Sequence, residues 1–221
     1  MNARRLKDLL YEQVARIGKA VSSPKRLELL EVLSQGEKHV EQLAAATDIS
    51  VKLASAHLKA LKSARLVESR RDGKNVLYRV AGAQVAGLWV ALRETAEARL
   101  TSLQTAMKEL VSHPNELSPI NGEELLAQAK RGDVMVIDVR PPGEYAAAHL
   151  PFARSIPLAE LRSRIGELPK SKPVVAYCRG PFCLMALEAV RLLNREGFQA
   201  ARFEQGVAEW HASGLPLARE A

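Results

Sequence analysis

The fold is decided by VEQLAAATDISVKLASAHLKALKSARLVESRRDGKNVLYRV, residues 40–80. This stretch begins with the pattern of two short helices joined by a turn. A helix is predicted over residues 40–47. After a tight turn, Ser50 is expected to be the N-cap of a second helix that ends near Ala64. This order of elements indicates a helix-turn-helix.

The same stretch continues into a basic β-hairpin. Two short strands are predicted over residues 66–70 and 76–80, with a turn at residues 71–75 that contains an Asp-Gly pair. A hairpin directly after a helix-turn-helix is the arrangement of a winged helix-turn-helix. In that fold the second helix enters the major groove of DNA, and the hairpin reaches the adjacent backbone or minor groove.

The second helix has an apolar face and a polar face. Its apolar positions are expected to face the core, and they are Leu53, Ala54, Leu58 and Leu61. Lys52, Ser55, Ala56 and Lys59 are left on the outer side. The wing residues expected to contact phosphates are Arg70, Arg71 and Lys74. The residues predicted to contact DNA are therefore Lys52, Ser55, Lys59, Arg70, Arg71 and Lys74.

Further helices are expected on both sides of this motif. Residues 5–20 have apolar side chains at helical spacing, and Ser23 and Pro24 start a helix that ends at Gly36. A long helix is predicted over residues 83–111. Its apolar stripe fits either a dimer interface or a core within one chain. The stripe consists of Val85, Leu88, Trp89, Leu92, Leu100, Leu103, Met107 and Leu110.

The charge of the chain is concentrated in its first half. Residues 1–112 carry a net charge of +7, whereas residues 113–221 carry as many acidic as basic side chains. A polyanion is one partner for such a surface, and a basic face without a ligand is the other interpretation. No segment is apolar for long enough to cross a bilayer, and the first twenty residues lack the apolar region of a secretory signal. A cytoplasmic protein is expected.

A domain boundary is predicted in HPNELSPINGEE, residues 113–124, where Pro, Asn and Gly concentrate. Beyond it, short apolar strands alternate with helices, which favours an α/β domain with a parallel sheet. The predicted strands are 134–137, 174–177 and 200–203, and the predicted helices are 122–131, 158–166, 184–196 and 206–212. The chain is therefore expected to have two domains, residues 1–112 and 113–221.

The only two cysteines, Cys178 and Cys183, lie in the segment YCRGPFCLMALEAV. Cys178 follows a predicted strand and faces the start of a helix, a place where backbone N–H groups stabilise a thiolate. We therefore predict a lowered pKa for Cys178. Cys183 is either a small buried residue or a resolving thiol that attacks a modified Cys178.

The first half resembles the ArsR/SmtB family of small dimeric repressors over roughly residues 5–110. The similar strings are SSPKRLELLEVL and the stretch from residue 40 to residue 80. The resemblance implies a homodimer, formed through the first and last helices, that binds an imperfect inverted repeat in double-stranded DNA. Because the helix before the second helix contains no Cys, and His39 and His57 fit surface or structural roles, no metal site and no other cofactor are expected.

The second half resembles the rhodanese family over roughly residues 115–217. The similar strings are VIDVRPPGEYAAAHLPFARSIPL, the cysteine segment, and GVAEWHASGLPL. The resemblance implies that Cys178 is the nucleophile that becomes a persulfide. It implies an active-site loop formed by Arg179, Gly180, Pro181, Phe182 and Cys183, and supporting structural roles for Asp138 and Arg140. Ala148 and Phe152 stand where the family usually has glycine.

Related phosphatases and arsenate reductases need an arginine six residues after the cysteine. Leu184 stands there, which disfavours those activities. Three functions remain. The first is a transcriptional regulator, expected to be a repressor, that responds to sulfane sulfur or redox signals, and the second is a sulfurtransferase with an accessory DNA-binding domain. The third is a repressor with an inert second domain, which an intact Cys178 argues against. Thiosulfate or polysulfide is the expected sulfur donor.

Overall fold

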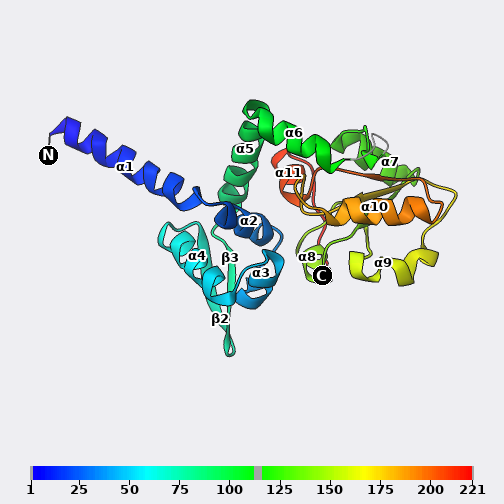
Figure 1. Cartoon of the computed structure of the whole chain (residues 1–221), viewed down its shortest axis with the longest axis horizontal. Helices are drawn as coiled ribbons and strands as arrows, with labels where there is room; N and C mark the ends of the chain where they lie inside the picture. Colours follow the sequence, from blue (N-terminus) through cyan, green and yellow to red (C-terminus); the bar gives the residue numbers. More distant parts are fainter. Residues whose placement is uncertain (1, 112–115, 221) are drawn as a thin grey trace. The chain divides into compact units, whose positions relative to one another are not determined.

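The computed structural model describes residues 2–111 and 116–220, and the chain divides into two compact units, Met1–Trp89 and Val90–Ala221 (Figure 1). The boundary predicted between residues 112 and 113, and Pro114 in the expected linker, lie outside the described residues. That boundary stays a prediction.

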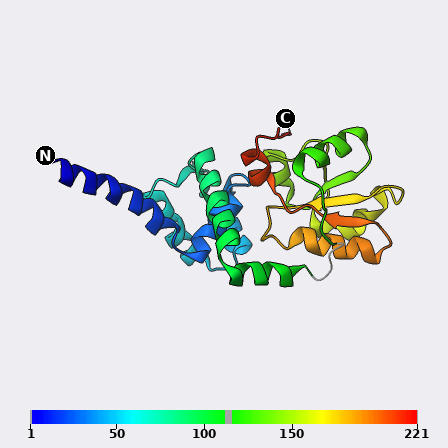
Figure 2. The same ribbon diagram turned by 90° about the horizontal axis from the view of Figure 1, so that it is seen from above.

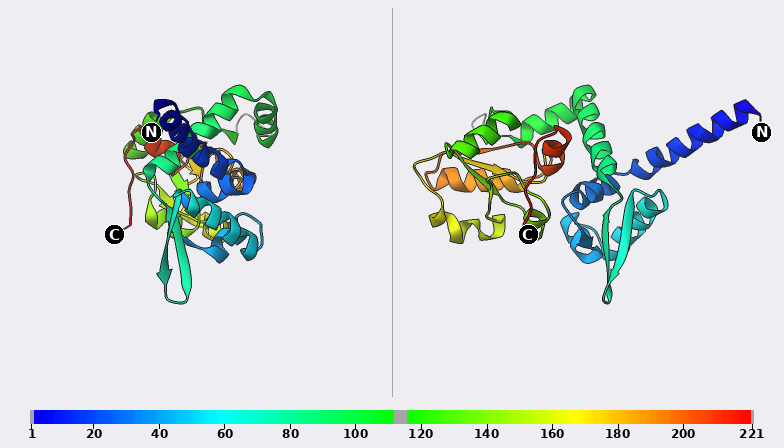
Figure 3. Two further views of the ribbon diagram at one scale, coloured as in Figure 1. Left: turned by 90° about the vertical axis from the view of Figure 1, so that its left-hand side faces the viewer. Right: turned by 180° about the vertical axis from the view of Figure 1, so that it is seen from behind.

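The first unit is a winged helix-turn-helix, as predicted. Its helices are α1 (Ala3–Val21), α2 (Pro24–Leu33), α3 (Val40–Ala46), α4 (Val51–Ser63) and the first part of α5 (Ala83–Arg99). Its strands are β1 (Lys38–His39), β2 (Val67–Asp72) and β3 (Asn75–Val80), which form an antiparallel sheet in the order β1-β3-β2. The β2–β3 hairpin projects as a ribbon from the rest of the unit (Figure 3).

Local sequence explains the two elements that carry the predicted DNA contacts. The Ser50 hydroxyl caps α4 by accepting a hydrogen bond from the backbone N–H of Leu53. The hairpin turns at Gly73, whose φ of 60° lies in the left-handed region that suits glycine. Leu53 was predicted to face the core, and this is wrong, because the residue is 44% exposed. Ala54, Leu58 and Leu61, the other three residues of the predicted face, are fully buried, so the apolar face of α4 is narrower than expected.

The single helix predicted over residues 83–111 is wrong, because the structure has two helices, α5 and α6 (Thr101–Leu110). Leu100 between them has an extended backbone, with φ −106° and ψ 104°. Thr101 and Ser102 are weak helix formers, and the side-chain amide of Gln104 donates to the Glu97 carbonyl that a continuous helix would use. The predicted stripe is accordingly interrupted, and Leu92 and Leu100 are exposed.

The second unit contains a four-stranded sheet in which every pair is parallel, as predicted (Figure 2). The strand order is β5-β4-β6-β7, with β4 at Met135–Asp138, β5 at Arg154–Ser155, β6 at Val174–Tyr177 and β7 at Ala200–Arg202. Its helices are α6, α7 (Gly122–Arg131), α8 (Pro142–Ala147), α9 (Leu158–Arg164), α10 (Met185–Arg195), α11 (Val207–Ala212) and the 3-10 turn Ile165–Glu167. Strand β5 and helix α8 were not predicted.

The two faces of this sheet pack into separate apolar clusters. Side chains alternate along each strand, so Ala176 of β6 joins one cluster and its neighbour Val175 joins the other. The first cluster includes residues of α9 and α10, and the second includes residues of α7 and α11. Cys178 belongs to the first cluster, on the α10 side of the sheet.

Candidate functional site

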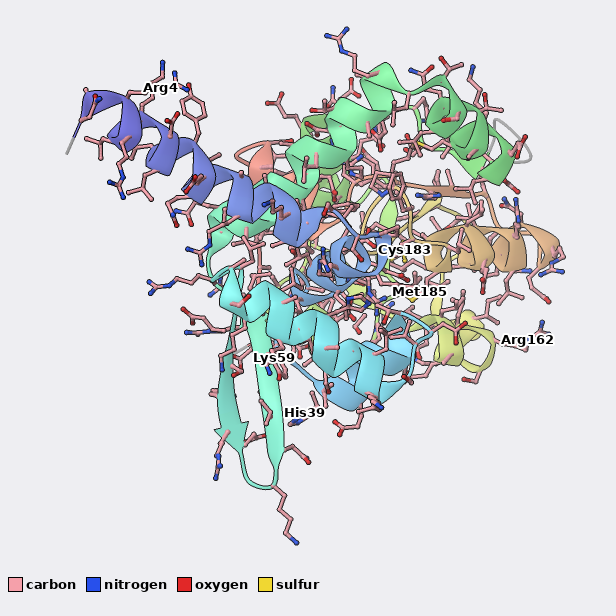
Figure 4. All side chains as sticks on the ribbon, turned by 60° about the vertical axis from the view of Figure 1, so that its left-hand side comes forward. Arg4, His39, Lys59, Arg162, Cys183 and Met185 are labelled. Atoms are coloured by element: carbon pink, nitrogen blue, oxygen red, sulfur yellow. The ribbon has the colours of Figure 1, made fainter. Side chains whose placement is uncertain are left out.

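The outer side of α4 presents the side chains predicted to read DNA. Lys52, Ser55 and Lys59 are exposed, as is Ala56. Ala54 and Leu58 anchor the opposite side in the core of the unit. Figure 4 shows Lys59 on this helix. The helix therefore offers short and basic side chains to solvent over two of its turns.

The cations of the wing differ in whether they form ion pairs. Arg71 and Lys74 are exposed, and neither forms an ion pair with a residue that the structure describes. Arg70, by contrast, donates to the Glu37 carboxylate through Nε at 3.1 Å and Nη2 at 2.8 Å. An exposed pair of this kind contributes little to stability and is screened by salt. A phosphate can therefore compete for Arg70, at the cost of separating it from Glu37.

One link between α4 and the wing was not expected. Lys62 Nζ donates to the Ser69 hydroxyl at 2.5 Å, from the last turn of α4 to strand β2. On β3, Arg79 pairs with Glu68 of β2 at 2.8 Å. The first contact links the hairpin to α4, and the second joins the two strands of the hairpin. The sequence spacing of Lys62 and Ser69 contains no local signal for the contact.

The cysteine loop connects β6 to α10. Cys178 follows the last residue of β6 and is 1% exposed, whereas Cys183 is partly exposed and lies two residues before α10 begins. Both are free thiols, and the Cys178 Sγ lies 3.4 Å from the Cys183 carbonyl oxygen. Figure 4 marks Cys183 and Met185 at the start of α10. The structure thus brings the two predicted cysteines into one hydrogen-bonded pair.

The lowered pKa predicted for Cys178 is wrong in this state of the loop. Burial raises the pKa of the Cys178 thiol, and its hydrogen bond to Cys183 raises it further. The pKa of Cys183 is instead lowered to about 6, because the Cys178 side chain donates to its sulfur and the backbone N–H groups of Arg179 and Met185 add to this. These opposite shifts favour Cys183 over Cys178 as the ionised member of the pair.

The other loop residues are held by groups around the loop. Arg179 forms a two-pronged ion pair with the buried Glu144 of α8, at 3.0 and 2.7 Å. Gly180 has φ 154°, and Phe182 is half-buried. Arg202 of β7 donates to the carbonyls of Gly180 and Pro181. No pattern in the sequence connects Glu144 or Arg202 with this loop.

Two further residues next to the loop were missed. The backbone of Gly206 approaches the loop so closely that a Cβ there would lie 2.1 Å from the Arg179 carbonyl oxygen. The Glu209 carboxylate lies beside Gly180, accepts from the Gly206 N–H at 2.9 Å, and pairs with Arg93 Nη2 at 3.4 Å. Burial raises the pKa of Glu209, and the charge of Arg93 opposes this. A helix-capping pattern from Gly206 to Glu209 is the one sequence signal that points to this carboxylate.

Asp138 and Arg140 form a fully buried ion pair after β4. Arg140 Nη2 lies 2.5 Å from Asp138 Oδ2, and the same nitrogen donates to the Ala148 carbonyl. The Tyr177 hydroxyl also donates to Asp138, at 2.5 Å. The pair thus joins β4, the segment after α8 and the end of β6 next to Cys178. Phe152, at a position where glycine was expected, has φ 65°.

Within residues 2–111 and 116–220, no group of three or more His, Cys, Asp and Glu side chains is arranged to hold a metal ion. No helix in the same ranges is long and apolar enough to span a bilayer.

Two protein families match the chain. The model of bacterial regulatory proteins of the arsR family matches residues 23–69, and the model of the rhodanese-like domain matches residues 121–213. The matched ranges contain helices α2 to α4 and the parallel sheet, respectively.

Relatives cover both parts of the chain. An HTH-type transcriptional regulator of Mycobacterium tuberculosis, Rv0324, is 43% identical over 96% of this chain and 92% of its own length. A sulfurtransferase of Allochromatium vinosum is 30% identical over 47% of this chain and 94% of its own length. A solution structure of the homodimeric winged helix-turn-helix domain of a possible ArsR-family regulator from Mycobacterium bovis is 44% identical. It covers 46% of this chain and 93% of that one, with a TM-score of 0.42.

Proposed function

Since this chain belongs to the arsR family of bacterial regulatory proteins and carries a C-terminal rhodanese-like domain, we propose that it is a repressor whose DNA affinity depends on the sulfur state of Cys178 and Cys183. The observation that carries this proposal is the pair of free cysteines in one loop, where the buried Cys178 Sγ lies 3.4 Å from the Cys183 carbonyl oxygen. We place this activity in the cytoplasm, where the DNA and a reducing thiol pool are found.

The DNA-binding part acts as a homodimer on an inverted repeat in double-stranded DNA. Lys52, Ser55 and Lys59 face the major groove, and the wing cations contact phosphates. Support for the dimer comes from α1, on which Leu10, Tyr11 and Val14 are between 60% and 71% exposed. A second copy of this helix is the occupant that covers such an apolar face.

Sulfur enters at Cys178. Its S–H proton passes to the Cys183 thiolate as the Cys178 sulfur attacks a sulfane sulfur of an inorganic polysulfide. The S–S bond of the polysulfide breaks, the shortened polysulfide leaves with the electron pair, and Cys178 carries a persulfide. The Cys183 thiol then loses its proton to solvent, to which it is the more exposed of the two.

The second step makes the modification a dithiol switch. The Cys183 thiolate attacks the Cys178 Sγ of the protonated persulfide, the S–S bond of the persulfide breaks, and the outer sulfur leaves with its proton and the electron pair as hydrosulfide. The two cysteines are oxidised to a disulfide, and the sulfane sulfur is reduced to sulfide. A bond between residues 178 and 183 reshapes the loop, and we infer that this lowers DNA affinity by a coupling of about 1–3 kcal/mol, or roughly five- to 150-fold.

A sulfurtransferase is the second candidate function, and its support is the similarity of the rhodanese-like part to the Allochromatium vinosum protein. In that case the Cys178 persulfide passes its outer sulfur to a small thiol or to cyanide and is regenerated. The 1% exposure of Cys178 favours slow single modification over rapid turnover. Multiple-turnover thiosulfate:cyanide activity by the full chain would instead favour the enzyme.

The test titrates a duplex of the chain's own promoter region with reduced and polysulfide-treated protein. Wild type is expected to lose affinity after treatment, with mass spectrometry showing a disulfide. Cys183→Ser lacks the proton acceptor of the first step, so it should form the Cys178 persulfide more slowly and stop there. Cys178→Ser should take up no sulfur and keep its affinity. Equal affinities in both states of wild type, with modification confirmed, would contradict the regulatory proposal. Sulfur found only on Cys183 would contradict the order of the steps.

A further inference from the structure

Arg202 is a buried cation directly beside the cysteine loop. It is the last residue of β7 and pairs in register with Ala176 of β6, two residues before Cys178. Its side chain is among the largest that are fully enclosed, with 1% exposure. The position therefore places a guanidinium under the segment that carries the proposed nucleophile.

The hydrogen bonds of Arg202 are incomplete and include no carboxylate. Its Nη2 donates to the carbonyl oxygens of Gly180, at 3.3 Å, and Pro181, while its Nε has no acceptor. Among the residues that the structure describes, no Asp or Glu forms an ion pair with Arg202, which sets it apart from the other buried arginines. Arg93 pairs with Glu209, and Arg140 pairs with Asp138.

A guanidinium enclosed without an anion is unfavourable, because the lost hydration is only partly replaced by neutral carbonyls. The unit therefore gains if an anion forms next to Arg202. Cys178 lies between Ala176, which pairs with Arg202, and Gly180, whose carbonyl Arg202 binds, and its sulfur can become an anion. The charge of Arg202 acts on this sulfur in the direction of a lower pKa, against the larger effect of burial. The Cys183 thiolate is instead favoured by Arg179.

We propose that Arg202 is the counter-cation of the Cys178 sulfur, and that it makes the loop select anionic sulfur donors such as inorganic polysulfide over neutral oxidants and alkylating agents. The inference rests on the proposed sulfur chemistry at Cys178. Its two parts are the stabilisation of the Cys178 thiolate or persulfide, and the attraction of an anionic donor into an enclosed loop. Arg202 acts through charge and takes no part in bond making.

The charged groups around Cys178 define the test. Cys183 faces it from the loop, Arg202 from β7, and Glu209 of α11 lies beside Gly180. The pair of Arg179 and Glu144 is a further charged neighbour of the loop. The measurements therefore use full-length protein with Cys183→Ser, in which Cys178 is the only cysteine and the Cys183 charge is removed.

In this background, Arg202→Gln is compared with Arg202→Lys and with Arg195→Gln, a control on the exposed side of α10. Arg202→Gln should slow sulfur addition from polysulfide at least about tenfold, the ratio that corresponds to one pKa unit. It should also raise the pH midpoint of iodoacetamide alkylation. The alkylation rate well above that midpoint should stay within about twofold. Arg202→Lys, which keeps the charge, should recover most of the polysulfide rate, and Arg195→Gln should match the background.

Two results overturn the inference. One is a pH midpoint of alkylation that is unchanged in Arg202→Gln. The other is that Arg202→Gln lowers the rate of sulfur addition from polysulfide and the rate of alkylation at high pH by the same factor, which indicates a distorted loop. A separate result bears on the proposed function, which fails if Cys178 takes up no sulfur in wild type or in any of these variants. The alkylation midpoints then still decide whether Arg202 stabilises the thiolate.

Discussion

Gly206 and Arg179 are in contact through their backbones, and a Cβ at residue 206 would lie 2.1 Å from the Arg179 carbonyl oxygen and 2.8 Å from the Cys178 carbonyl oxygen. Neither oxygen belongs to a side chain that can rotate away. The start of α11 therefore packs directly against the backbone of the cysteine loop.

Gly206→Ala should destabilise the second unit by about 1–3 kcal/mol, because the methyl group has to displace backbone. Urea unfolding of the full chain measures this. Gly166→Ala is the matched control, since nothing lies within 4 Å of a Cβ there. An unfolding free energy for Gly206→Ala equal to that of the control would contradict the contact.

Phe152→Gly should stabilise the second unit by about 0.5–1 kcal/mol. Phe152 has φ 65° and is 57% exposed, so the strain of a left-handed backbone costs more than the ring contributes. Phe152→Ala keeps the strain and removes the ring, and it should give no gain. If the Ala and Gly variants unfold at the same denaturant concentration, the strain is absent.

The pKa of Cys183 should rise in Cys178→Ala. The Cys178 side chain is the largest cause of the lowered pKa of Cys183, so removing this donor makes the thiolate less favourable. Iodoacetamide alkylation followed by mass spectrometry should give a midpoint near pH 6 for Cys183 in wild type and a higher one in the variant. An unchanged midpoint would show that the backbone N–H groups alone stabilise the thiolate.

Arg71→Ala and Lys74→Ala should each reduce the slope of log affinity against log salt by about 0.9, the value for one phosphate contact. Neither residue has a competing ion pair among the described residues.

Glu37→Gln should act in the opposite direction and strengthen DNA binding, because it releases Arg70 for a phosphate. Binding to a promoter duplex at several salt concentrations tests all three, and slopes identical to wild type would argue against a wing contact.

Arg93→Met should destabilise the second unit by about 3–5 kcal/mol at neutral pH, since it leaves the Glu209 charge buried without its partner. The pKa of Glu209 is already raised, so the folded state holds its proton to higher pH than the unfolded state. The Glu209 contribution to stability therefore falls as pH rises through the carboxyl range, and it should fall further in the variant. Adding Glu209→Gln should restore much of the loss. If the double variant is no more stable than Arg93→Met, the pair is not the cause.

Much of the fold was predictable from local patterns. The Ser50 cap, the Asp-Gly turn and the apolar strands before Asp138 and Cys178 mark their elements within a few residues of sequence. The two-residue strand β5 carries no periodic signal, and the break at Leu100 has no Gly or Pro to mark it. Strand β5 depends on its pairing with β4, and the break depends on the Gln104 side chain, whose hydrogen bond to Glu97 no periodic pattern marks.

The cysteine loop was found through Cys178, but its electrostatics were not. Strand-to-helix position alone favours a Cys178 thiolate, whereas burial and the Cys183 sulfur reverse this. Arg202 lies in β7 and Glu209 lies in α11, more than twenty positions along the chain from Gly180, the loop residue beside both. Their influence follows from sheet order and packing, which the sequence pattern does not contain.

The buried contact of Asp138, Arg140 and Tyr177 has a consequence for how the second unit comes apart. Beyond their bonds to each other, Arg140 donates to the carbonyl of Ala148, and Asp138 accepts from the Tyr177 hydroxyl at the end of β6. Detaching any one of these segments leaves a charge or donor stranded in an apolar interior. Partly open forms are therefore costly, and amide protons of β4 and β6 should exchange together, at the rate of global unfolding.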